Sequence, residues 1–438
     1  MTGAVTRGPD AVDQPAAARL SLRGNAPYRR LWSAVAISQT GDWLLFIALP
    51  LYVLQVSGSA LATSSVFLAE LLPAVVVATA CGPVTDRVNP ARLLAALTAF
   101  QAVVLLPLLW LGPGRLWMVY PVTAVQAALT SVTAPAQQAV VPALVPADDL
   151  PAANAMVELA ANMARLIGSP LGGLLLPVLG LDGLVLGDAA TFILGATLLS
   201  GCRGSAAPAA VRQATRTAGR LGAVAEGWHA VRGETTLTAA VVISFLGALA
   251  QGMFLVLFVL FVLRLLHAGA EVVGLLRGVQ AVGGVAGGLI VGAWAARLGA
   301  RALTVGGLLA FGLVSLITWN SPLLTSDTWW YVALFAAVGI PATALSTGLI
   351  TGTQRSAPPG VLGRTLSLMQ AAQALGQGTG ILAAGLLSAS ISLTALLDLQ
   401  AGCYLACALV ALTSFARRPG PPSARRRGAG ADIADTTA

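Results

Sequence analysis

The chain has 438 residues, of which 57% are hydrophobic and only 10% are charged, and its formal net charge is +8. Soluble domains carry about 25% charged residues, and a water-soluble protein this apolar would expose large adhesive patches. The composition therefore excludes an ordinary soluble protein and predicts that lipid solvates much of the surface. Nucleic acid is not an expected partner, because no basic stripe with interleaved aromatic residues stands on a polar module.

All basic residues are arginine, and alanine, glycine and proline are abundant, which indicates a GC-rich bacterial genome. The four cysteines lie in or beside apolar runs and the two histidines are far apart, so neither a metal site nor another cofactor is expected. Residues 1–27 are polar and lack the apolar core of a signal peptide. They are predicted to form a disordered cytoplasmic tail.

Apolar stretches predict twelve transmembrane helices, because a helical span needs about 20 mainly apolar residues. The first six are expected at about 30–54, 61–82, 92–112, 116–138, 154–178 and 183–203, and the second six at about 236–262, 269–295, 302–320, 328–351, 364–388 and 392–415. The segments 116–138 and 364–388 give the weakest signal because Gln and Thr dilute them.

A polar segment divides these spans into two groups of six. Residues 28–203 and 236–416 are predicted to be six-helix bundles, joined by a cytoplasmic linker at 204–235. The linker ends in Glu226-Gly-Trp-His-Ala-Val-Arg232, a pattern typical of a short amphipathic helix at the membrane interface. Residues 417–438 are predicted to be a basic, disordered cytoplasmic tail.

The arginines lie mainly in alternate loops, which gives the chain a direction in the membrane. Cytoplasmic loops carry an excess of basic residues, and that rule places both termini in the cytoplasm of a bacterial cell. The predicted outer loops contain little arginine beyond Arg115 and Arg264, as the rule requires. One predicted inner loop, around Asp148 and Asp149, lacks arginine and is the exception.

A loop motif recurs after the second and the eighth spans. The first copy consists of Gly82, Asp86, Arg87 and Arg92, with Asn89 in place of a later glycine. The second copy consists of Arg297, Gly299 and Arg301, with Ala296 in place of the acid. In these residues the chain resembles the major facilitator superfamily. The stretches Tyr28-Arg-Arg-Leu-Trp32, Ser38-Gln-Thr-Gly-Asp-Trp43, Gly58-Ser-Ala-Leu61 and Glu70-Leu-Leu-Pro73 resemble the branch of enterobactin exporters and macrolide efflux proteins.

This resemblance covers about 28–416 and implies an all-α membrane fold of two pseudo-symmetric six-helix bundles that works as a monomer. It implies a conformational-switch role for Gly82, Asp86, Arg87, Arg92, Arg297 and Arg301, although these residues also fit simple anchoring at anionic headgroups. Gly168, Pro170, Gly172 and Gly173 resemble an exporter signature with the proline displaced by one position. Their small size suits close helix packing.

Three charged residues are predicted near the membrane midplane, where an ionisable group is a functional candidate by default. At 1.5 Å per residue, Asp42, Glu70 and Arg165 each lie ~16–18 Å from the inner surface. Asp42 and Glu70 are proton-coupling candidates, with Arg165 stabilising the ionised form; a structural ion pair is the alternative. Arg277 is expected to snorkel or to pair with Glu271 at an outer gate, and Asp188 to be solvated.

Polar residues also interrupt the apolar spans. Gln370, Gln373 and Gln377 share one face of a helix, and Gln39 and Gln251 lie within two other spans. These five are substrate-cavity candidates, with bridging between helices as the alternative.

The sequence therefore predicts a secondary transporter in the bacterial inner membrane, since it contains no P-loop for ATP. Lipid, protons and a small molecule are the expected partners. Proton-coupled efflux of an amphipathic drug, antibiotic or siderophore is the first interpretation. Import of a metabolite by the same fold, or a non-transporting sensor or scaffold, remain alternatives. An enzyme is not expected, because no nucleophile stands with a base.

Overall fold

The computed structural model describes residues 24–80, 89–146, 149–202, 231, 233–357 and 362–414. Within these ranges the chain folds into helices joined by short turns and contains no strand, so the predicted all-α class is confirmed. The two predicted tails, the central linker and the loop carrying Gly82, Asp86 and Arg87 lie outside the described residues, apart from a few at their edges.

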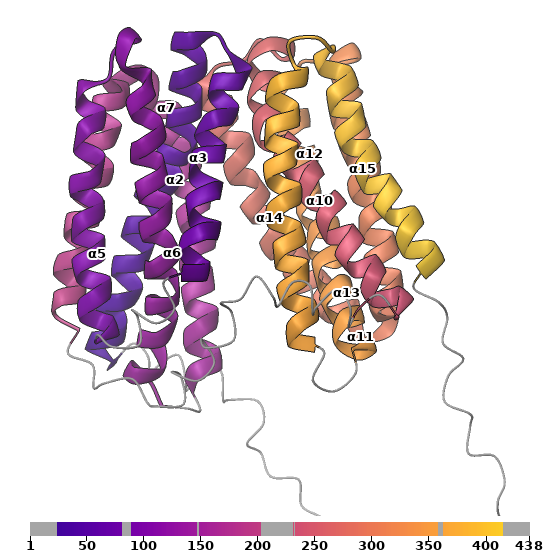
Figure 1. Ribbon diagram of the computed structural model, residues 1–438, viewed down its shortest axis with the longest axis horizontal. Helices are drawn as coiled ribbons and strands as arrows, with labels where there is room; N and C mark the ends of the chain where they lie inside the picture. The colour runs from indigo at the N-terminus through magenta and orange to yellow at the C-terminus, as the bar shows by residue number, and fades with distance from the viewer. Residues whose placement is uncertain are drawn as a thin grey trace, which may run out of the picture.

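The helices form two groups that stand side by side in Figure 1. The first group comprises α2 (Ala26–Ser57), α3 (Ala60–Ala80), α5 (Pro90–Leu105), α6 (Val119–Leu144) and α7 (Leu150–Ser200), with the 3-10 turns η1 (Leu106–Trp110) and η2 (Pro113–Met118) between α5 and α6. The second group comprises α10 (Thr235–Leu260), its π-helical continuation η5 (Phe261–Leu265), α11 (Ala270–Asn320), the turn η6 (Ser321–Leu323), α12 (Thr328–Ala337), α13 (Gly339–Ser356), α14 (Leu362–Leu387) and α15 (Leu393–Ser414). The start of α2 and the end of α15 point towards the same end of the molecule, which we call the terminal end; the opposite one is the far end.

Two glycines divide the longest helices. α7 and α11 each contain 51 residues, roughly 75 Å at 1.5 Å per residue and more than twice the hydrocarbon thickness of about 30 Å. Gly180 (φ 66°, ψ 179°) and Gly299 (φ 72°, ψ 161°) interrupt them. This backbone region is open essentially to glycine alone. Each helix therefore consists of two segments, and the turns fall where the sequence predicts loops.

Eight helices of the described residues are long and apolar enough to cross a membrane, with α7 (Ala152–Ser200) counted once and α11 counted as Ala270–Ala293 and Arg297–Leu323. α3, α6 and α14 are not among them. α6 and α14 are the two segments that Gln and Thr dilute. α3 is 21 residues long, and its sequence stays apolar after Pro73, as Ala-Val-Val-Val-Ala-Thr-Ala. The exact count of twelve spans stays a prediction.

Side-chain caps fix several helix starts. Asn25 accepts a hydrogen bond from the Tyr28 backbone N–H at 3.0 Å, and the Asn89 side chain accepts from the N–H groups of Ala91 (3.0 Å) and Arg92 (3.4 Å). Such caps satisfy N–H groups that have no partner inside the helix. Asn89 stands where the superfamily motif has glycine, so this departure from the motif supplies the cap of α5.

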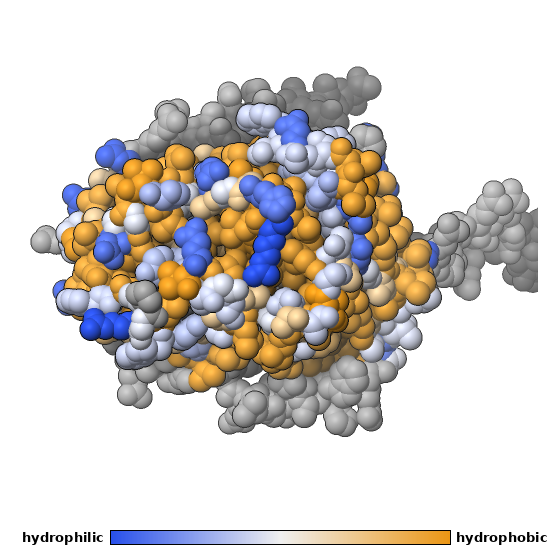
Figure 2. All heavy atoms as spheres, turned by 90° about the horizontal axis from the view of Figure 1, so that it is seen from above, coloured by the Kyte–Doolittle hydropathy of each residue, from blue (hydrophilic) through white to orange (hydrophobic). Residues whose placement is uncertain are grey.

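The outer surface is apolar over much of the molecule. Figure 2 shows the far-end face, on which hydrophilic side chains form separate patches among apolar residues. Large apolar side chains such as Leu72, Val178, Leu289 and Leu324 are more than half exposed. A soluble protein rarely exposes so much contiguous apolar surface, so these side chains are suited to contact lipid.

Glycines bring the two groups of helices together near the far end. A Cβ atom at Gly173 of α7 would collide with the backbone of Ala270, and one at Gly274 of α11 with the backbone oxygen of Ser169. Between α3 and α14, a Cβ at Gly385 would collide with Ser64. All these contacts lie near the far-end limits of their helices. We call them the far-end seam.

Burial along α14 shows that the groups separate towards the terminal end. Successive residues of a helix are rotated by about 100°, which places Gln370, Gln373, Gln377, Ile381 and Ala384 on one face. Gln370 and Gln373 are exposed, Gln377 is half-buried, and Ile381 and Ala384 are fully buried. The opposite face carries the exposed Leu375, Leu382 and Leu386. The inner face of α14 is therefore closed at the far end and open towards the terminal end.

Candidate functional site

An acidic cavity of about 430 Å³ lies among the helices of the first group. Three carboxylates from three helical segments line it: Asp42 of α2, Glu70 of α3 and Asp188 from the second segment of α7. Asp42 and Glu70 are half-buried, and Asp188 is 2% exposed. The structure thus places both proton-coupling candidates on one cavity and adds a third acid.

Asp188 is a correction to the sequence interpretation, which expected it to be solvated. The turn at Gly180 brings the chain back into the bundle, so Asp188 lies about two helical turns inside it. There Gly41 of α2 leaves room for the carboxylate, because a Cβ at that position would collide with Asp188 and Thr191. The Thr191 hydroxyl lies 3.1 Å from Asp188 Oδ1.

Asp42 links the other two acids electrostatically, and Glu70 also interacts with one arginine. The charge of Glu70 interacts with those of Asp42 and Arg277, and the charge of Asp42 with that of Asp188. Two further polar atoms of the cavity wall, Thr123 Oγ1 and Gln126 Oε1, are buried without a partner. Among the described residues, no three acidic, His or Cys side chains are arranged to hold a metal ion.

Arg165 lies on a different cavity from these acids. Its Nη2 donates to Gln280 Oε1 of α11 at 3.1 Å, and its guanidinium lies 5.3 Å from the Trp43 ring centroid. The arginine that interacts with Glu70 is Arg277 of α11, which sequence reasoning placed at the outer surface. Arg277 is only 7% exposed, so it does not snorkel. Its Nη1 also donates to Gln280 Oε1, at 3.1 Å.

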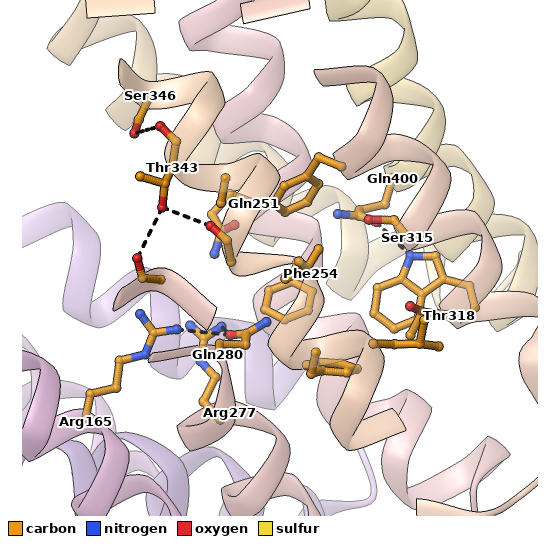
Figure 3. A pocket seen from close by; sticks show the side chains of 18 residues that line it. Arg165, Gln251, Phe254, Arg277, Gln280, Ser315, Thr318, Thr343, Ser346 and Gln400 are labelled. Atoms are coloured by element: carbon orange, nitrogen blue, oxygen red, sulfur yellow. Dashed lines mark hydrogen bonds between the residues drawn. The ribbon is translucent and has the colours of Figure 1, made fainter. Parts of the chain in front are cut away.

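The second cavity, of about 350 Å³, is the cationic cavity (Figure 3). One residue that lines the cationic cavity, Arg165, comes from the first group of helices. The other lining residues come from α10, α11, α12, α13, α15 and the junctions between them. Phe254, Phe311, Trp319 and Phe335 give it apolar walls, and Gln251, Gln280, Ser315, Thr318 and Gln400 give it hydrogen-bonding groups. A buried hydrogen bond of 3.0 Å from Trp319 Nε1 to Gln400 Oε1 holds one wall.

Two aromatic residues of α2 separate the cavities. Trp43 and Phe46 line the acidic cavity, and their rings contact each other at 5.0 Å between centroids. On their other side they lie near the arginines, since Phe46 is 5.7 Å from the Arg277 guanidinium. Such placements are favourable because the ring face attracts cations. We call Trp43 and Phe46 the aromatic wall.

The small residues predicted in the fifth span position Arg165. A Cβ at Gly168 would collide with the Thr40 oxygen and one at Gly172 with the Leu44 oxygen, so these glycines allow α7 to approach α2 closely. Pro170 and Gly173 face α11, against Gly278 and Ala270 respectively. Arg165 therefore projects from a segment packed against both groups of helices.

The remaining candidates have varied positions. Gln251 lines the cationic cavity, whereas Gln370, Gln373 and Gln377 lie on the inner face of α14, and Gln39 is half-buried on α2. Of the switch-loop residues, Arg92 and Arg297 are exposed at the terminal end. Arg301 donates from Nη2 to the Leu412 backbone oxygen at 3.0 Å, which ties α11 to the end of α15.

Comparison with known proteins agrees with this architecture. A family model described as transmembrane secretion effector matches residues 19–423. The chain belongs to the transmembrane secretion effector family. None of the curated proteins matches the sequence. This match and the solved structures similar to it confirm the predicted membership of the major facilitator superfamily.

Solved transporters share the fold of this transmembrane secretion effector. A bacterial homologue of the iron transporter ferroportin in an inward-facing state superimposes with a TM-score of 0.68 at 15% identity, covering 89% of this chain and 99% of that one. The nucleoside transporter NupG gives 0.68 at 11% identity, with 90% and 100% covered. A POT family transporter in complex with a thioalcohol-conjugated peptide gives 0.67 at 14% identity, with 89% and 96% covered. At these identities the likeness concerns the fold alone.

Proposed function

We propose that this protein exports a small amphipathic molecule from a bacterial cell and is driven by protons that flow in the opposite direction. The observation that carries the proposal is the pair of cavities. Ionisable acids line one, and aromatic and hydrogen-bonding groups line the other. Acids inside a membrane protein are costly to bury and mark proton or ion pathways, and a mixed apolar and polar cavity suits a small amphipathic ligand.

In this proposal Asp42 and Glu70 carry the protons and the cationic cavity holds the substrate. The terminal end faces the cytoplasm, so substrate enters between the groups of helices from that side. Rocking of one bundle against the other about a central site gives alternating access. The far-end seam opens as the terminal end closes, and the substrate leaves outside.

Two observations support export over import. The family description contains the word secretion, and the small residues at Gly168, Gly172 and Gly173 resemble the exporter signature. Import of a metabolite by the same fold is the competing outcome of the experiment below.

The test is accumulation of a panel of fluorescent and antibiotic compounds in efflux-deficient bacterial cells that express the full chain. Glu70→Gln removes a cavity acid, and Glu271→Gln is the matched control, because Glu271 is an exposed acid at the start of α11. We expect lower accumulation of at least one compound, lost on adding a protonophore and in Glu70→Gln but retained in Glu271→Gln. Higher accumulation would reverse the direction, and unchanged transport in Glu70→Gln would remove Glu70 from the coupling mechanism.

A further inference from the structure

Two arginines from opposite groups of helices converge on one neutral atom. Arg165 of α7 and Arg277 of α11 both donate to Gln280 Oε1 at 3.1 Å, and Figure 3 shows both guanidinium groups directed at this amide. Each guanidinium has five N–H donors and no acceptor. A single amide oxygen therefore accepts hydrogen bonds from only two of the ten N–H groups of the pair, and because it is neutral it does not compensate the positive charge.

The surroundings leave this positive charge largely uncompensated. Three aromatic rings lie beside the guanidiniums, those of Trp43, Phe46 and Phe254, with 5.1 to 5.7 Å between guanidinium carbon and ring centroid. Glu70 is the acid whose charge acts on Arg277, and the two arginines act on each other. Asp42 acts on Glu70 and on Asp188 from the acidic cavity, on the other side of the aromatic wall. Glu70 is therefore the direct counter-charge of Arg277, and one carboxylate meets two guanidiniums. Arg165 Nε is also buried without a hydrogen-bond partner.

The charged pair stands at one edge of a cavity that is otherwise suited to an uncharged body. Phe254, Phe311, Trp319 and Phe335 offer ring surfaces, while Ser315 and Thr318 offer hydroxyl groups. Buried charges in proteins are normally paired, and planar guanidinium groups match carboxylates in two-point hydrogen bonding. The cavity thus has a site for an acidic head and walls for an aromatic or aliphatic body.

We propose that the cationic cavity binds an organic anion, whose carboxylate or similar acidic group lies between Arg165 and Arg277 and whose apolar part packs on the aromatic walls. This proposal names the substrate class of the transport site and so rests on the proposed function. Because the two arginines come from different bundles, the bound acid bridges both groups of helices. Gln280 holds the two guanidiniums in position when the anion is absent.

The test is binding to the purified full-length protein in lipid nanodiscs, measured by equilibrium dialysis against empty nanodiscs. The probes are 2-naphthoxyacetate, its neutral amide 2-naphthoxyacetamide, and the cation 2-naphthylethylammonium, which share one ring system. We expect the carboxylate to bind roughly 10- to 100-fold more tightly than the amide, as hydrogen bonds to charged groups exceed neutral ones, and the cation to bind most weakly. No preference for the carboxylate over the amide, whether both bind or neither does, overturns the proposal.

Variants separate loss of the site from loss of the fold. Gln280→Glu places a carboxylate of the protein itself between the two arginines, so we expect thermal stability to be kept or raised while the preference for 2-naphthoxyacetate disappears. Arg277→Lys keeps the charge but not the planar fork, and should retain a reduced preference. Arg264→Gln, at a far-end arginine that bonds the Gly58 backbone oxygen, is the control. A Gln280→Glu protein that is stable and still selects the carboxylate overturns the proposal.

This experiment does not depend on energised transport. Selective binding with no protonophore-sensitive efflux would leave the anion site standing and remove the proposed proton-driven export. Protonophore-sensitive efflux of neutral or cationic compounds, with no binding preference for the carboxylate, would support proton-driven export and remove the anion site.

Discussion

The close packing in the far-end seam predicts how one substitution shifts the balance between conformations with the far end closed and open. Gly274 of α11 packs so closely on α7 that a Cβ atom there would collide with the Ser169 backbone oxygen and lie 3.0 Å from Pro170 Cα. Both atoms belong to the backbone of a helix, so neither can rotate away as a side chain would. Gly274→Ala should therefore destabilise the conformation in which the seam is closed.

The size of the effect follows from the cost of overpacking, typically 1–3 kcal/mol. A conformation with an open seam avoids this collision, so the substitution should shift the balance towards it by roughly 5- to 150-fold. Gly288→Ala is the matched control, because Gly288 lies on the same helix and nothing stands within 4 Å of its Cβ position.

The assay is double electron–electron resonance between pairs of spin labels, in a background without the native cysteines. Labels at the exposed Arg115 and Leu324 report the far end, and labels at the exposed Arg92 and Arg364 report the terminal end. In Gly274→Ala we expect the far-end distances to lengthen and the terminal-end distances to shorten. Identical distributions in Gly274→Ala and Gly288→Ala would refute the idea that this seam controls opening.

Three further substitutions test local features of the fold. Gly299→Ala places a side chain at φ 72° and ψ 161°, which costs about 1–3 kcal/mol, so thermal unfolding in detergent should occur at lower temperature than in Gly292→Ala, where a Cβ meets nothing. Asn89→Ala removes the cap of α5, at about 1 kcal/mol, and should speed hydrogen exchange in its first turn, whereas Asn89→Asp should not. Trp319→Phe leaves the buried Gln400 oxygen without its donor, at about 1–3 kcal/mol, and adding Gln400→Leu should restore most of the lost thermal stability.

Hydropathy predicted the positions of most helices because it measures which residues can sit in lipid. The expected breaks near 180 and 299 contain two of the three described glycines with positive φ, Gly180 and Gly299, and the second span, expected at about 61–82, is α3 (Ala60–Ala80). The ends are less accurate because helices continue beyond the apolar core; α2 starts at Ala26 owing to its Asn25 cap. Hydropathy reports nothing about such caps.

The site was only partly predictable, because sequence spacing gives depth in the membrane but not direction around the bundle. Counting residues placed Asp42, Glu70 and Arg165 at one depth, and the first two do line one cavity. It gave no means of seeing that Arg165 points to Gln280 in the other group of helices. Asp188 and Arg277 were misplaced because both follow a far-end turn closely. The chain re-enters the bundle there within two helical turns, at Gly180 and at Gly269.

The arrangement around the aromatic wall indicates how the two cavities can influence each other without sharing a ligand. Trp43 and Phe46 belong to α2, in the same helix as Asp42, while the arginine beside Phe46 belongs to α11 of the other group. A rotation of one group against the other changes the distance from α2 to Arg277. It therefore changes the cation–π contact between Phe46 and Arg277 and also the strength of the charge interaction between Arg277 and Glu70. A rigid-body motion is then sufficient to alter the acidic cavity and the cationic cavity together, because the wall and the acids move with one bundle and Arg277 moves with the other.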